Sequence, residues 1–294
     1  MIREIEMIGI VGESGCGKST TARLLLRIID PTAGKIYFNG QDLSALNRKE
    51  LHHIRKEMQM VFQDPFASLN PRMRIRDIIA EPLICCTDMS AQDRTARVNE
   101  LLQIVGLNTN YADRFPHEFS GGQRQRICIA RALALNPKLI ICDEAVSALD
   151  VSIRSQVLNL LSDLQKKFDL TYIFISHDLS VVKHISDRVC VMYLGKIMEL
   201  APKAELFSNP IHPYTKALLS AIPIPDPLVH PNRIILEGDI PSPVNPPEGC
   251  RFQTRCYEIG GDTALCEKCC TLQPGWVEVV PSHFVACHKY SSAQ

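Results

Sequence analysis

The stretch GESGCGKST, residues 12–20, constrains the fold of this chain more than any other. It has the spacing G-x-x-x-x-G-K-[ST], with Lys18 and Ser19 at the last two fixed positions. An apolar, β-branched run at residues 7–11 precedes it, and apolar side chains at helical spacing follow it. The sequence therefore predicts a strand, a glycine loop and a helix in that order, which is the arrangement that binds phosphate.

Every residue of this loop is a candidate for nucleotide binding. The set comprises Gly12, Glu13, Ser14, Gly15, Cys16, Gly17, Lys18, Ser19 and Thr20. The backbone N–H groups would face an anion, the Lys18 amine would reach the β- and γ-phosphates, and the Ser19 hydroxyl would bind Mg²⁺. The alternative is a glycine-containing turn that matches the pattern by chance.

Two adjacent acids follow a second apolar run, residues 139–142. Ligands of open α/β sheets bind at the carboxyl ends of the strands, so Asp143 is a candidate Mg²⁺ ligand. Glu144 would polarise a water that attacks the γ-phosphate. A solvated acidic turn is the simpler alternative.

A second glycine-containing turn precedes the predicted helix 124–135. It consists of Ser120, Gly121, Gly122 and Gln123. A helix N-terminus with these residues is a further candidate anion site. The alternative is that Ser120 only caps the helix.

The rest of the chain fits an α/β domain with a largely parallel sheet, because strand-like and helical segments alternate. Lysine plus arginine and aspartate plus glutamate both number 32, so no basic field indicates nucleic-acid binding. The apolar runs are too short to span a bilayer, and the first residues lack the features of a signal peptide. A cytosolic protein is expected.

The motifs together resemble those of an ATP-binding cassette (ABC) ATPase, over about residues 5–205. The resemblance rests on GESGCGKST, Gln63 after a strand, FSGGQRQR, IICDEAVSALD and Ser176-His177-Asp178. It implies that two cassettes face head to tail and that the glycine loop of one and residues 119–123 of the other clamp each ATP. Gln63 would sense Mg²⁺ and the attacking water. His177 would be the switch histidine, where otherwise a surface or capping role would be expected.

The resemblance also predicts the domains. Residues 1–205 would form a P-loop ABC ATP-binding domain with a helical signature subdomain at about 64–135, and residues 206–294 a Pro- and Cys-rich extension. Prolines between 208 and 249 predict an extended connector. Relatives carry a few dozen residues before the glycine loop, including an aromatic that stacks on adenine and strands of a β-subdomain. Because the loop here begins at Gly12, a truncated start is expected, with weaker ATP binding.

VFQDPFASLNPRM, NPIHPYTKALLSAIPIPDP and the cysteine-rich tail resemble importers of oligopeptides and dipeptides. That resemblance implies a second ABC ATPase, two membrane permeases, an extracytoplasmic peptide-binding protein and a position at the cytoplasmic face of the membrane. A nickel importer and a non-hydrolysing regulatory cassette are the alternatives. An ABC ATPase acting on DNA or ribosomes is disfavoured, because no coiled-coil insertion or basic arm is present.

Six of the twelve cysteines lie between residues 250 and 287. Crowded thiols in a cytosolic segment favour a metal over disulfides, and Cys266-x2-Cys269 alone favours Zn²⁺. Similarity to importer ATPases with a [4Fe–4S] tail favours iron–sulfur instead. The ligands would be Cys250, Cys256, Cys269 and Cys287, with Cys266 the alternative third ligand. Reduced thiols without metal are the remaining interpretation.

Overall fold

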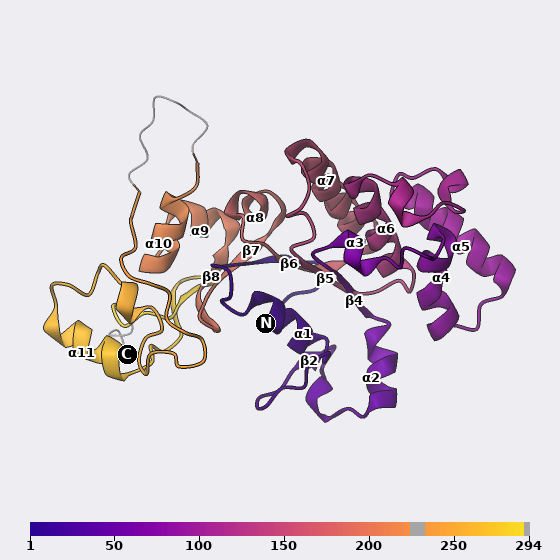
Figure 1. The fold of residues 1–294 in the computed structure, drawn as a ribbon. Coiled ribbons are helices and arrows are strands. Elements are labelled where there is room, and N and C mark those ends of the chain that lie inside the picture. Colours follow the sequence, from indigo (N-terminus) through magenta and orange to yellow (C-terminus); the bar gives the residue numbers. More distant parts are fainter. Residues whose placement is uncertain (224–232, 291–294) are drawn as a thin grey trace. The chain divides into compact units, whose positions relative to one another are not determined.

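A computed structural model describes residues 1–223 and 233–290 of the chain (Figure 1). The chain divides into two compact units. The first consists of Met1–Glu6 and Ser19–Ile175, and the second of Met7–Lys18 and the residues from Ser176 onward. The division into residues 1–205 and 206–294 stays a prediction.

Three parallel strands form the sheet of the first unit. They are β4 (Met58–Val61), β5 (Leu139–Asp143) and β6 (Thr171–Ile175), in the order β4-β5-β6. Every residue of β5 is buried, which explains its unbroken apolar sequence. The two predicted acids, Asp143 and Glu144, therefore lie at the carboxyl end of the strand, as the sequence indicates.

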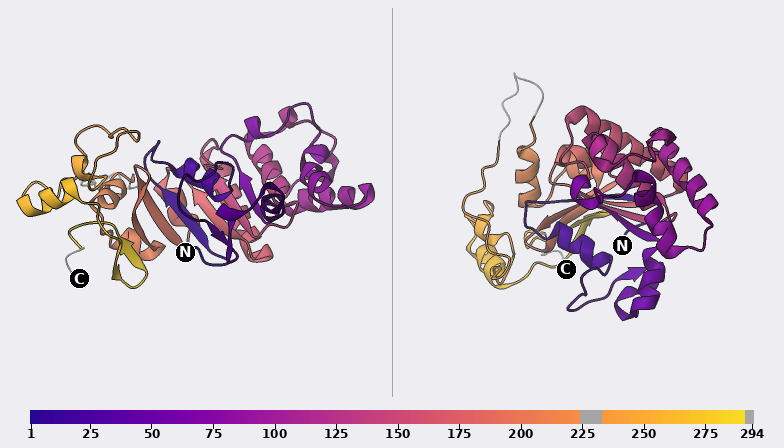
Figure 2. Two further views of the ribbon diagram at one scale, coloured as in Figure 1. Left: turned by 90° about the horizontal axis from the view of Figure 1, so that it is seen from below. Right: turned by 45° about the vertical axis from the view of Figure 1, so that its right-hand side comes forward.

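Helices make up most of the rest of the first unit. They are α1 (Lys18–Leu25, whose first residue belongs to the second unit), α2 (Arg48–Arg55), α3 (Pro65–Ser68), α4 (Ile75–Cys86), α5 (Ala91–Ile104), α6 (Gly121–Leu133) and α7 (Val151–Phe168). Helices α4, α5 and α6 pack against one another, as Figures 1 and 2 show. Their shared core includes Ile79, Leu102 and Ile127, all fully buried. Helices α3 to α6 lie within the range of about 64–135, and the assignment of that range as a helical subdomain stays a prediction.

Short elements complete the first unit. They are the hairpin β2 (Tyr37–Phe38) and β3 (Gln41–Asp42), and 3-10 turns at Leu43–Ala45, Thr109–Tyr111 and Pro116–Glu118. The hairpin strands pair only with each other, and Tyr37 is largely exposed. Such a two-stranded ribbon contributes little to the core.

Five strands lie in the described residues of the second unit. They are β1 (Met7–Val11), β7 (Arg188–Tyr193), β8 (Lys196–Pro202), β10 (His283–Val285) and β9 (Val277–Val280), in that order. Strands β1 and β7 are parallel, and the other neighbours are antiparallel. Gly9 allows α8 (Leu179–Ile185) to lie close to β1, because a Cβ at Gly9 would sit 2.4 Å from Val182 Cγ1.

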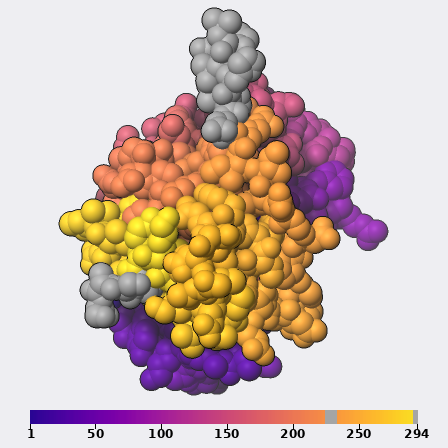
Figure 3. Space-filling view, turned by 90° about the vertical axis from the view of Figure 1, so that its left-hand side faces the viewer, coloured from indigo at the N-terminus to yellow at the C-terminus, as the bar shows by residue number. Residues whose placement is uncertain are grey.

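The remaining elements of this unit lie in the C-terminal extension, whose atoms form a continuous surface in orange and yellow (Figure 3). They are α9 (Lys203–Ser208), α10 (Pro213–Ser220), α11 (Thr263–Thr271) and a 3-10 turn at Gln253–Arg255.

The prediction of an uninterrupted extended connector over 208–249 is wrong at its start. Pro213 opens α10, where proline needs no N–H partner, and His212 caps the helix by accepting a hydrogen bond from Tyr214 N. The part of the predicted connector at 224–232 lies outside the described residues. Within the described parts of the chain, none of the helices has both the length and the apolar character needed to cross a bilayer.

Candidate nucleotide site

The glycine loop lies in the second unit between β1 and the start of α1. Gly12 is required by a close approach, because a Cβ there would fall 2.2 Å from the Met192 carbonyl oxygen. Gly17 has a φ of +101°, which side-chain-bearing residues rarely adopt. Both glycines are thus needed for the curled backbone that the sequence predicts.

Lys18 is drawn into this loop. Its side chain is buried, and Nζ donates to the carbonyl oxygens of Gly12 at 2.8 Å and of Glu13 at 3.0 Å. Burial raises the pKa of the neighbouring Cys16 thiol, and Lys18 opposes that shift. The ammonium therefore has neutral oxygen partners in the loop and no thiolate counter-charge beside it, which leaves it able to bind an anion.

In the first unit, Ser19 and Asp143 are brought together. The Ser19 hydroxyl donates to Asp143 Oδ1 at 2.9 Å, and Asp143 is buried at the end of β5. Hydroxyl and carboxylate oxygens are hard ligands of the kind that Mg²⁺ prefers. These two of the three residues predicted to bind Mg²⁺, the third being Gln63, lie more than 120 positions apart in sequence but are direct neighbours in the fold.

Gln63 and Glu144 form a second pair in the same unit. Gln63 Nε2 donates to Glu144 Oε2 at 2.9 Å. Glu144 has a φ of +49°, in the left-handed region that is unfavourable for a residue with a Cβ. Its backbone is held there because its N–H donates to Ile175 O and its carbonyl accepts from Ser147 Oγ. Strain held in place in this way is typical of functional positions.

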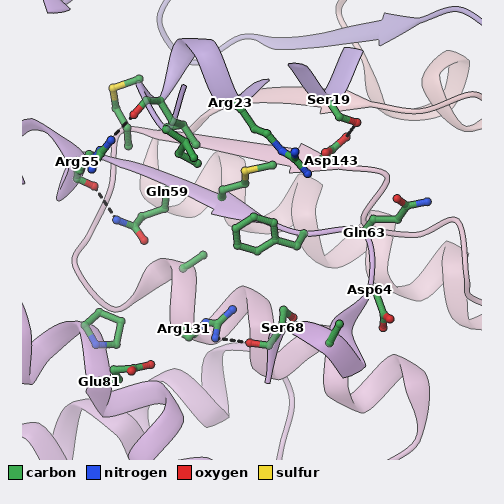
Figure 4. A pocket seen from close by; sticks show the side chains of 18 of the residues that line it. Ser19, Arg23, Arg55, Gln59, Gln63, Asp64, Ser68, Glu81, Arg131 and Asp143 are labelled. Atoms are coloured by element: carbon green, nitrogen blue, oxygen red, sulfur yellow. Dashed lines mark hydrogen bonds between the residues drawn. The ribbon is translucent and has the colours of Figure 1, made fainter. Parts of the chain in front are cut away.

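A cavity of about 830 Å³ adjoins these side chains in the first unit (Figure 4). Ser19, Gln63 and Asp143 all line it. Two of its arginines are engaged with backbone carbonyls, since Arg55 donates to Leu26 O and Arg131 to Ser68 O. The three predicted Mg²⁺ ligands thus share one water-accessible space.

The turn at Ser120–Gln123 is a capping box at the start of α6. Ser120 Oγ accepts from Gln123 N at 3.3 Å, and Gln123 Oε1 accepts from Ser120 N at 3.0 Å. Gly122 is required by packing, because a Cβ would lie 2.3 Å from Ile153 Cγ2, whereas Gly121 is exposed. Ser120 therefore caps α6, and the anion-binding role of this turn stays a prediction.

His177 lies in the loop between β6 and α8, in the second unit. Its neighbours fix the backbone: Ser176 Oγ accepts from Asp178 N, and Asp178 Oδ1 accepts from Ser180 N. The loop presents the His177 side chain at an exposed position. Its role as a switch stays a prediction.

The four predicted cysteine ligands lie near one another in the second unit. Burial raises the pKa of Cys269 to about 12, with added contributions from Cys250, Cys287 and Cys256. Burial likewise raises the pKa of Cys287 to about 11, and Cys250 and Cys256 add to it. Cys266 instead interacts with Cys270, one turn further along α11.

These thiols do not form a recognisable metal site. Among residues 1–223 and 233–290, no three His, Cys, Asp or Glu side chains lie close enough together to hold a metal ion. The structure therefore does not support the iron–sulfur prediction.

A glycine loop with a buried lysine, and a serine–aspartate pair at the end of a parallel strand, are features of P-loop nucleotide-hydrolysing proteins. Comparison with known families agrees, because residues 1–147 match the ABC transporter family. Residues 198–261 match the oligopeptide/dipeptide transporter C-terminal region. The chain belongs to the ABC transporter family, as one of its ATP-binding, ATP-hydrolysing subunits.

Similar proteins extend over most of the chain. It is 58% identical over 294 residues to the oligopeptide transport ATP-binding protein AppF of Bacillus subtilis, covering 99% of this chain and 87% of that protein. It is 54% identical over 287 residues to the oligopeptide transport ATP-binding protein OppF of Haemophilus influenzae, covering 97% and 85%. Among solved structures, the ATP-binding cassette MJ0796, as a dimer bound to ADP and Pi, matches with a TM-score of 0.63. The identity is 32%, and the match covers 69% of this chain and 88% of that one.

Two residues that contact the glycine loop are not indicated by the sequence. Tyr214 and Arg255, both in the C-terminal extension, hydrogen-bond to Glu13. Nothing in their sequence context indicates this contact, because it joins positions about 200 or more residues apart.

Proposed function

We propose that this chain is the ATP-hydrolysing subunit of a bacterial or archaeal importer of dipeptides or oligopeptides. The observation that carries the proposal is the pair of contacts at the end of β5, Ser19 with Asp143 and Gln63 with Glu144. It occurs in a chain that is 58% identical to an oligopeptide transport ATP-binding protein over nearly its whole length.

The phosphate-binding groups would be the loop N–H groups, from Gly12 to Thr20, and the Lys18 amine. Lys18 would exchange its two loop carbonyls for β- and γ-phosphate oxygens. Ser19, Gln63 and Asp143 would hold Mg²⁺, which neutralises charge on those oxygens. The Ser19–Asp143 distance and the burial of Asp143 fit that set of oxygen ligands.

Hydrolysis would depend on Glu144, which would orient and polarise the attacking water. Gln63 donates to the Glu144 carboxylate and so holds it at a fixed angle. His177 would contact the γ-phosphate from its exposed loop position. The turn Ser120, Gly121, Gly122 and Gln123 would close the nucleotide site of a second cassette, in a head-to-tail dimer.

The partners would be a second ABC ATPase, either another copy or a sister subunit, two transmembrane permeases and an extracytoplasmic peptide-binding protein. The chain would bind the permeases at the cytoplasmic face of the membrane. The match of residues 198–261 to the oligopeptide/dipeptide transporter C-terminal region supports this assignment over other ABC transporters.

Uptake by cells tests the proposed cargo. Replacing the native chain by Glu144→Gln should abolish uptake of labelled dipeptides or oligopeptides and leave nickel uptake unchanged. Glu100→Gln is the matched control, because Glu100 is a surface residue of α5 paired with Arg97. Loss of nickel uptake alone would favour the nickel importer. Normal uptake of both by the Glu144→Gln variant would favour a non-hydrolysing regulatory cassette.

For the tail, the finer proposal is that Cys250, Cys256, Cys269 and Cys287 hold a [4Fe–4S] cluster. Its support is that Cys250, Cys256 and Cys287 lie near enough to Cys269 to add to the rise in its pKa, which burial causes first. The described residues do not fit a metal as they stand, so ligation would require the thiols to move closer. Anaerobically purified protein should then be brown and contain iron. Colourless protein with stoichiometric zinc would contradict it.

A further inference from the structure

The segment at 211–215, IHPYT, is not used by the proposed mechanism, yet its backbone is fixed by a buried carboxylate. Glu199 in β8 is fully buried and accepts from Ile211 N at 2.8 Å and from His212 N at 2.9 Å. Its Oε1 lies 2.6 Å from His283 Nε2. A buried carboxylate with this many partners holds the start of α10 in one position.

The fixed turn directs Tyr214 to the glycine loop. His212 Nδ1 accepts from Tyr214 N at 3.0 Å, and the Tyr214 side chain is fully buried. The Tyr214 hydroxyl oxygen accepts from Glu13 N at 3.0 Å. The N–H of Glu13 is therefore bonded to the extension.

Arg255 contacts the same loop residue through its side chain. Arg255 Nη1 lies 2.9 Å from Glu13 Oε2, with side chains only 10% and 25% exposed. The segment that carries it is packed on Tyr214, because the Phe252 ring centroid lies 5.3 Å from those of Tyr214 and Tyr193. Backbone and side chain of Glu13 are thus both held by the C-terminal extension.

We propose that Tyr214 and Arg255 are positioning residues of the nucleotide site, which brace the first turn of the glycine loop through Glu13. This inference rests on the proposed role of that loop. The Glu13 carbonyl also accepts a hydrogen bond from Lys18 Nζ. Glu13 is therefore in contact both with this brace, formed by Tyr214 and Arg255, and with the proposed phosphate-binding lysine. Arg255 further offsets the negative charge of Glu13 next to the place where a triphosphate would bind.

Removing the arginine should weaken nucleotide binding. In Arg255→Gln the Glu13 carboxylate loses its counter-charge and repels phosphate, so the Kd for MgATP should rise about threefold to tenfold. KM should rise with it, while kcat stays within about twofold, since the groups at the end of β5 are untouched. Tyr214→Phe should give a smaller increase, about twofold, because it removes one neutral hydrogen bond.

A double-mutant cycle separates this role from a general loss of structure. Glu13→Gln removes the charge that Arg255 offsets, so the Glu13→Gln/Arg255→Gln chain should bind MgATP within about twofold of wild type. Arg251→Gln is the matched control, because Arg251 lies in the same segment and donates to Pro247 O at 2.9 Å. It should leave the Kd unchanged.

The experiment is titration of each full-length variant with MgATP, alongside a thermal melt of each. An unchanged Kd in Arg255→Gln, an equal increase in Arg251→Gln, or no rescue by Glu13→Gln would overturn the brace while the wild type still binds ATP. A wild-type chain that binds no nucleotide would overturn the proposed function, and the brace with it.

Discussion

Side chains of types that can bind metals occur both at the carboxyl end of β5 and in the cysteine-rich tail. The two regions differ in how closely these side chains are positioned relative to one another. At β5, Ser19 and Asp143 are hydrogen-bonded at 2.9 Å, as are Gln63 and Glu144. In the tail, burial and the neighbouring Cys250, Cys256 and Cys287 raise the pKa of Cys269, but within the described residues no three such side chains are close enough for a metal ion. Side chains at the end of a buried parallel strand are placed by the sheet ladder, whereas those of the tail depend on turns and one short helix.

The largest expected effect tests the β5 side of this comparison. Asp143→Asn removes the charge proposed to bind Mg²⁺, and ATP hydrolysis should fall by at least about 100-fold. Cys269→Ser, the matching change in the tail, should leave hydrolysis by the isolated protein within about twofold. Initial rates of phosphate release measure both. Equal losses in the two variants would contradict the separation of the regions.

A smaller effect is expected when pH changes the stability of the fold through His212, which caps α10 in the extension. Burial lowers the pKa of His212 to about 4, and Glu199 opposes this shift. As the pH is lowered, His212 in the unfolded chain takes up a proton near the ordinary pKa of 6.5, whereas in the folded chain it does so only near 4. The contribution of His212 to stability is therefore full above pH 6.5 and is lost as the pH falls to about 4. His212 alone contributes up to about 3 kcal/mol to the free energy of unfolding.

Urea unfolding at pH 7.5, 6 and 4.5 measures this loss. In His212→Asn, whose amide oxygen can still cap α10, the decline between pH 6.5 and about 4 should be shallower than in wild type. His52→Asn, on the surface helix α2, is the control and should follow wild type. Parallel curves for wild type and His212→Asn would show that this histidine does not titrate as described.

The same contrast explains what the sequence could predict. The loop at 12–20 and the acids after β5 were predictable, because their spacing is set by a strand, a turn and a helix next to one another in the chain. A role for Gln63 followed only from the family resemblance, and its hydrogen bond to Glu144 was not predicted. The brace on Glu13 was not predictable, because Tyr214 and Arg255 reach it through tertiary packing around Phe252 that no local pattern indicates.

The helix at 213–220 shows a second limit. Prolines between 208 and 249 predicted an extended connector, yet Pro213 occupies the first turn of α10, where its fixed φ favours a helix. The buried carboxylate of Glu199 fixes that turn, and its effect on a segment more than ten positions away could not be read from composition.

We propose that Glu144, which accepts a hydrogen bond from Gln63 at the end of β5, activates water for ATP hydrolysis. The most direct measurement is MgATP binding and phosphate release by the Glu144→Gln protein beside wild type and Glu100→Gln. Glu144→Gln should bind MgATP at least as tightly as wild type while releasing phosphate at least about 100-fold more slowly, and Glu100→Gln should be unchanged. Phosphate release by Glu144→Gln at the wild-type rate would contradict it.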